Sequence, residues 1–88
     1  MVKPTWDLQD TYMARATANT LLTIRGCRTV GAIARRADLA RESINNYENA
    51  KRLPSLRSLR RLSFAYKISL TELVTKIDQE YQRLRNGP

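Results

Sequence analysis

Four polar side chains that could contact nucleic-acid bases lie close together in the sequence: Arg41, Glu42, Asn45 and Asn46. In a DNA groove, arginine can pair with guanine, asparagine with adenine, and a carboxylate with the amino group of cytosine. Ile44 and Tyr47 lie between and beyond them, spaced as on one face of a helix. The sequence therefore predicts a short helix with a thin apolar stripe and an outer face suited to base edges.

This short helix must be positioned by its neighbours, and residues 30–49 predict a helix, a tight turn and a second helix. Ile33, Ala34 and Ala37 share one helix face before the turn. Asp38 then interrupts the pattern, and aspartate is among the few non-glycine residues that tolerate the positive φ of such a turn.

The segment resembles the helix-turn-helix of the lambda-repressor-like family of phage and bacterial regulators, also called XRE or Cro-type. The resemblance begins with a small residue, Ala34, followed four residues later by a turn at Asp38. Apolar residues lie on both sides of the turn and in the second helix: Ala37, Leu39, Ile44 and Tyr47. The continuation NYENAKRLPSL and residues 68–73 are also similar, so the resemblance spans about Leu21 to Val74. It implies an all-α fold, namely a compact bundle of about five helices.

A chain of 88 residues has room for one domain with one modest core. We expect a single helix-turn-helix domain over residues 1–88, with an arm (1–6), the helix-turn-helix (30–49) and an extended C-terminal helix (70–85). The arm either reaches into a DNA groove or forms a tail with Trp6 packed on the core.

The first helix is predicted to begin after an Asp7 cap and to run to about Arg25, where Gly26 ends it. Leu21 and Leu22 are its strongest core candidates. Thr29 is expected to cap the second helix, from Val30 to Ala37.

Three residues replace glycines that are common in the family: Asp38, Ala50 and Lys67. Ala40 stands where a serine or threonine cap is usual, and losing such a cap costs on the order of 1 kcal/mol. These departures predict a slightly strained and less stable domain with an unchanged apolar pattern.

Ser55 is expected to cap a fourth helix, from Leu56 to Tyr66, and Ser69 with Glu72 forms a capping box for the fifth. The predicted inward positions of the fourth helix are Leu56, Leu59, Leu62 or Ser63, and Tyr66. Those of the fifth are Leu70, Leu73, Val74, Ile77, Tyr81 and Leu84.

The end of that last stripe, Ile77, Tyr81 and Leu84, has no obvious internal partner in the sequence. Two arrangements remain open. The stripe forms a homodimer contact, which would place two reading helices about one DNA turn apart, or the helix folds back on the first helix.

The net charge of +8 and a pI near 10.4 favour a polyanionic partner. Residues 35–61 hold eight basic and three acidic residues, so +5 of the +8 overlaps the predicted helix-turn-helix. This concentration favours double-stranded DNA over a uniformly solvated basic surface.

Histidine is absent and Cys27 is the only cysteine, so the usual zinc ligands and nucleophile–base pairs are missing. We expect no enzyme activity, no metal and no cofactor. No apolar stretch approaches a membrane span, no signal peptide is apparent, and a lone cysteine fits a reducing cytoplasm.

The resemblance implies which residues would contact DNA. Base contacts fall to Ala40, through a thymine methyl, and to Arg41, Glu42, Asn45 and Asn46. Phosphate contacts fall to Thr29, Asn49, Lys51 and Arg52, with Arg28 and Arg57 as weaker candidates. Tyr47 is expected to close the core, and Glu48 to pair with Arg15 or Arg25.

The leading hypothesis is a sequence-specific transcriptional regulator of small Cro- or repressor-like type. The alternative is an antitoxin-type protein-interaction module that also binds its own operator, since an exposed apolar stripe on the last helix would suit a protein partner. An RNA-associated basic protein is a third interpretation, which would need exposed aromatic stacking platforms.

Overall fold

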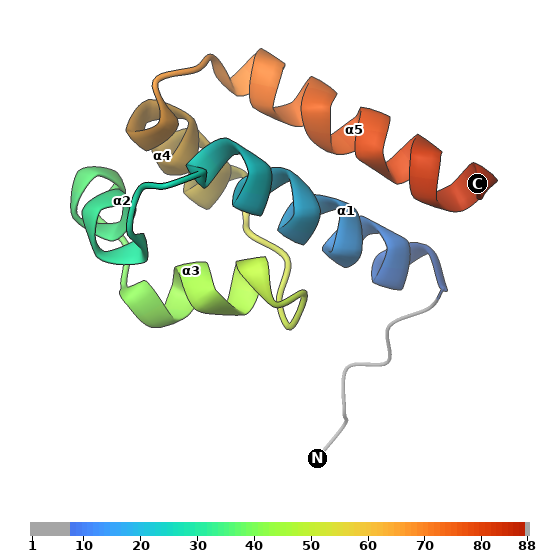
Figure 1. Cartoon of the computed structure of the whole chain (residues 1–88), viewed down its shortest axis with the longest axis horizontal. Helices are drawn as coiled ribbons and strands as arrows, with labels where there is room; N and C mark the ends of the chain where they lie inside the picture. Colours follow the sequence, from blue (N-terminus) through green and yellow to red (C-terminus); the bar gives the residue numbers. More distant parts are fainter. Residues whose placement is uncertain (1–7, 88) are drawn as a thin grey trace.

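Helix α1 (Leu8–Arg25) is the central element of the fold, with α3 on one side and α5 on the other (Figure 1). Its buried side chains are small apart from one: Ala14, Ala16, Thr17, Ala18, Thr20 and Leu21. Small side chains let neighbouring helices approach closely from two sides, which explains why its apolar stripe is loose in the sequence. Leu21 is fully buried as predicted, whereas Leu22 is 43% exposed and that prediction was wrong.

The computed structural model describes residues 8–87, with side chains from residue 10, and these residues form five α-helices. The helices after α1 are α2 (Val30–Ala37), α3 (Arg41–Glu48), α4 (Leu56–Tyr66) and α5 (Leu70–Asn86). The predicted all-α fold of about five helices is confirmed. The predicted arm and the Asp7 cap lie outside the described residues.

One core joins all five helices, and each helix contributes one fully buried large side chain: Leu21, Ile33, Ile44, Leu62 and Leu73. Two predicted core residues are instead exposed, Leu56 at 69% and Val74 at 43%. Leu56 lies in the i, i+4, i+8 row with exposed Arg60 and Phe64, so it points away from α2 and α5. Val74 follows Leu73 by one residue, so its side chain is turned about 100° from that of Leu73 and lines an open groove with Met13 and Leu59.

Three helices begin with the predicted side-chain caps. The hydroxyls of Thr29, Ser55 and Ser69 each accept a hydrogen bond from a backbone N–H three residues later, at 3.0, 3.1 and 3.0 Å. Each bond satisfies a donor that would otherwise lack a helical partner. Ala40, before α3, makes no such bond, as the sequence predicted.

The helices α2, α3 and α4 are each followed by a non-glycine residue with positive φ: Asp38 (55°), Ala50 (58°) and Lys67 (63°). The next backbone N–H closes each end by bonding a carbonyl five residues back, as in Leu39 to Ala34 at 3.0 Å. Left-handed backbone costs an L-residue roughly 1–2 kcal/mol. The replaced glycines identified in the sequence are thus sites of local strain.

Helix α5 packs roughly antiparallel on α1 (Figure 1). Ile77 and Tyr81 are each 6% exposed and belong to the core, and Leu84 packs partly buried against it. The premise that this stripe lacks an internal partner was therefore wrong, because α1 is that partner. Of the two open arrangements, the chain adopts the one in which the helix folds back on α1, and a dimer contact through Ile77, Tyr81 and Leu84 would need side chains that are already buried or partly buried.

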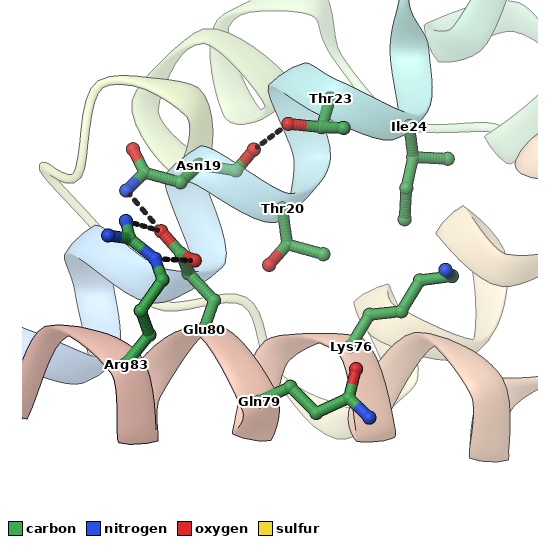
Figure 2. A pocket seen from close by; sticks show the side chains of 8 residues that line it. All are labelled: Asn19, Thr20, Thr23, Ile24, Lys76, Gln79, Glu80 and Arg83. Carbon is green, nitrogen blue, oxygen red and sulfur yellow. Dashed lines mark hydrogen bonds and ion pairs between the residues drawn. The ribbon is translucent and has the colours of Figure 1, made fainter.

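A polar network also joins α1 to α5 beside a groove of about 330 Å³ (Figure 2). The Asn19 amide donates to Glu80 Oε2 at 2.8 Å, and Arg83 donates to both Glu80 oxygens at 2.8 and 2.7 Å. The hydrogen bonds from Arg83, and then from Asn19, lower the pKa of Glu80 to about 2.

The lowered pKa makes the stabilising effect of Glu80 dependent on pH. It is present in full above the ordinary pKa of 4.5 and is lost as the pH falls towards about 2. We expect Glu80→Gln to be less stable than the wild type at pH 7, with the difference shrinking towards pH 3. Urea unfolding at a series of pH values measures this, and a difference independent of pH would contradict it.

Replacement of Lys67, whose φ is 63°, by glycine should relieve strain at the end of α4. We expect Lys67→Gly to raise the free energy of unfolding by about 0.5–1 kcal/mol, since relief of strain outweighs the added freedom of the unfolded chain. Urea denaturation measures the change. Gly26→Ala, at φ 56°, is the matched control and should destabilise; an unchanged or lower stability of Lys67→Gly would refute the strain.

Candidate nucleic-acid interface

Helix α3 is held against α1 and α2 by one face. Ile44 is fully buried, Tyr47 is 7% exposed, and both belong to the core. The Tyr47 hydroxyl donates to Ser58 Oγ of α4 at 3.3 Å. The prediction that Tyr47 closes the core is confirmed, and the opposite face of α3 is left towards solvent.

An ion pair fixes the end of α3 to the end of α1. Arg25 donates from Nε to Glu48 Oε2 at 2.8 Å and from Nη2 to Oε1 at 3.1 Å. The side chains are 21% and 6% exposed, respectively. The sequence allowed Arg15 or Arg25 as the partner of Glu48, and the structure shows that the partner is Arg25. The pair also offsets the unfavourable place of a carboxylate at a helix C-terminus, and it raises the pKa of Arg25.

Arg61 of α4 stabilises the turn between α2 and α3. Its Nη1 donates to the Asp38 carbonyl at 2.9 Å and contacts Asp38 Oδ2 at 3.3 Å. In the sequence Arg61 lies off the predicted inward positions of the fourth helix, which by itself indicates only a solvated helix face. No local pattern could have revealed this role, because the two residues are 23 positions apart.

The predicted base-contacting residues lie together on the outward face at the start and middle of α3. Ala40, Arg41, Glu42 and Asn45 are exposed and Asn46 is half-buried. Within residues 10–87, none of the four polar side chains makes a hydrogen bond or ion pair, either with one another or with other residues. Their donors and acceptors remain free for an external partner.

The predicted phosphate-contacting residues lie at the two ends of α3. Thr29 caps α2, and the guanidinium of Arg41, the first residue of α3, reaches Gly31 in the first turn of α2. Lys51 and Arg52 are exposed in the loop that follows α3. Asn49 is less available than predicted, because its amide donates to the Asn45 carbonyl at 2.8 Å.

The two weaker phosphate candidates differ in the structure. Arg28 donates to the carbonyls of Ile24 and Arg25, at 2.7 and 3.3 Å, and lies 5.5 Å from the Tyr66 ring centre, so it completes the end of α1. Arg57 is exposed in a depression beside the turn, together with Leu39, Ser55, Ser58 and Arg61. The structure therefore favours Arg57, which the sequence ranked low.

The Tyr66 hydroxyl lies in the interior behind this surface and has no hydrogen-bond partner among the described residues. Burial, and then the Glu48 carboxylate, raise the pKa of Tyr66 to about 12. The group is therefore neutral at physiological pH and adds no charge to the interface.

No cluster of potential metal ligands occurs within the described part of the chain. None of the helices in that part has the length and apolar character needed to span a membrane.

A family model described as helix-turn-helix matches residues 28–73, more than half of the chain, and these residues contain α2, α3 and α4. The chain belongs to the lambda-repressor-like helix-turn-helix family. Proteins of this XRE family are DNA-binding regulators and are typically not enzymes. The match ends at Leu73, so α1 and most of α5 lie outside it. No curated protein and no solved structure gave a significant match to this helix-turn-helix protein.

The Arg25–Glu48 pair generates a stability prediction. Glu48→Gln keeps the shape but removes the charge, and hydrogen bonds to charged groups contribute about 1.5–3 kcal/mol, so we expect a loss in that range. Urea unfolding measures it, with Asp78→Asn at an exposed position in the middle of α5 as the control. A Glu48→Gln protein as stable as that control would show that the pair does not anchor α3.

Proposed function

We propose that this protein is a sequence-specific transcriptional regulator, of small phage or bacterial Cro- or repressor-like type, that reads the major groove with residues 40–49. The observation that carries the proposal is the division of α3 into two faces. One is fixed by the core and by Arg25, and the other presents four polar side chains without partners. A recognition helix needs a rigid scaffold and free hydrogen-bonding groups.

Each base contact follows from its chemistry. Arg41 would pair with a guanine, and Asn45 or Asn46 with an adenine, each good bidentate pair giving about 1–3 kcal/mol of discrimination. Ala40 would touch a thymine methyl at the helix start. Glu42 would accept from a cytosine amino group or repel wrong positions.

Phosphate contacts would fix the register of α3 without reading sequence. Lys51 and Arg52 would hold the backbone at one end of α3, and Thr29 with the free N–H groups at the start of α2 at the other. Asn49 would contribute through its second amide hydrogen. We add Arg57 to this set because it lies beside the turn and is exposed.

The antitoxin-type alternative depended on an exposed apolar stripe along α5. Ile77 and Tyr81 are buried against α1, so the stripe on which that alternative depended is not exposed. The proposed regulator would act in the cytoplasm of a bacterium, on double-stranded DNA, as a monomer on one half-site or as a dimer through another surface.

Two substitutions separate the proposed roles of Arg41 and Lys51. Arg41→Ala should lower affinity for the preferred duplex about 10-fold or more and relax selection at one or two base pairs. Lys51→Ala should weaken all duplexes alike and reduce the salt dependence by about one counterion. Fluorescence anisotropy on preferred and shuffled duplexes, at several salt concentrations, gives both quantities.

Arg15→Ala, an exposed change on α1, is the control and should have a small effect. Equal losses on preferred and shuffled DNA for both Arg41→Ala and Lys51→Ala would contradict the division between base and phosphate contacts.

A further inference from the structure

Gly31 is in direct contact with the head group of Arg41. A Cβ atom built on Gly31 would lie 2.8 Å from Nη2, 3.1 Å from Cζ and 3.2 Å from Nε of Arg41. All three distances are shorter than ordinary van der Waals contacts, so the guanidinium occupies the space that a side chain at position 31 would need.

The backbone gives no reason for a glycine at this position. Gly31 is the second residue of α2 and is not among the residues with positive φ. Glycine inside a helix is destabilising relative to alanine, because it loses more conformational freedom on folding. Because α2 has only eight residues, this loss of helix stability matters. The one advantage of glycine at position 31 that the structure shows is the space that it leaves for the side chain of Arg41.

The contact with Gly31 matters because Arg41 is the residue proposed to pair with a guanine. Its long side chain would otherwise sample many rotamers at the exposed start of α3, and ordering such a side chain on binding costs affinity. In the structure the guanidinium lies against Gly31 in the first turn of α2, while its hydrogen-bond donors remain without a partner in residues 10–87. A preorganised guanidinium selects a base more sharply than a mobile one.

We propose that Gly31 is a positioning residue for Arg41, and that the missing side chain at position 31 determines which base Arg41 selects. This inference rests on the proposed DNA-reading function. It predicts that Gly31→Ala changes stability and base selection in opposite directions. The fold should become more stable, because the displaced atoms belong to the flexible end of Arg41 and not to the core. Base selection should become weaker, because Arg41 is displaced.

The test compares the wild type with Gly31→Ala, Arg41→Ala and the double variant. Each is titrated with the preferred duplex and with duplexes changed one base pair at a time. Gly31→Ala should raise the urea midpoint and lower the preference about 10-fold at the same base pair that Arg41→Ala affects. In the Arg41→Ala background, Gly31→Ala should leave the base preference unchanged, because Gly31 is proposed to act only through Arg41. The four proteins form a double-mutant cycle that measures this coupling.

Ala32→Gly, at the next and exposed position of α2, is the matched control and should lower the urea midpoint without changing base preference. Three results would overturn the positioning role. They are an unchanged base preference in Gly31→Ala, a uniform loss on every duplex, and an equal effect of Gly31→Ala with and without Arg41.

A second measurement tests the contact between Gly31 and Arg41 in the absence of DNA. The Nε–Hε resonance of Arg41 in the free protein should shift in Gly31→Ala and stay in place in Ala32→Gly, and an unshifted resonance in Gly31→Ala would also overturn the proposal. If the wild type prefers no sequence, the proposed function fails, and base selection by Arg41 fails with it, whatever the resonance shows.

Discussion

Helix α3 is too short to hold its own shape, and the rest of the structure depends on how that is overcome. An isolated helix of eight residues is unstable in water, and α3 also lacks a side-chain cap at its start. Its stability comes from tertiary contacts: Ile44 in the core, Tyr47 against Ser58, and Glu48 paired with Arg25. Every one of these contacts uses the inner face, which is why the outer face can be wholly polar.

The other helices supply the contacts that α3 needs. Helix α1 is central because it supplies Arg25 and small side chains against which α3 and α5 pack. Helix α4 secures the turn before α3 through Arg61 and its bond to the Asp38 carbonyl. Helix α5 covers the far side of α1, so its apolar stripe completes the core. Arg41 at the start of α3 and Lys51 and Arg52 just after its end remain exposed, where their charge favours a polyanion.

Local signals in the sequence predicted local structure well. The caps at Thr29, Ser55 and Ser69 and the positive φ of Asp38 depend on a few neighbouring residues, and all are present. Errors arose where tertiary placement decides. Leu22, Leu56 and Val74 are apolar, yet each side chain is at least 43% exposed. The partner of Ile77 and Tyr81 and the role of Arg61 depend on residues far along the chain. The assignments of Arg41, Glu42, Asn45 and Asn46 to bases remain predictions.

Selection of duplexes from a random library by the purified chain, at near-physiological salt, tests the central claim most directly. Our account predicts enrichment of a defined sequence that includes guanine or adenine positions within reach of α3. A palindrome would indicate two copies on DNA, and an asymmetric site a single copy. Binding that falls with salt but enriches no sequence would contradict the account, because it would leave a basic surface without a reading helix.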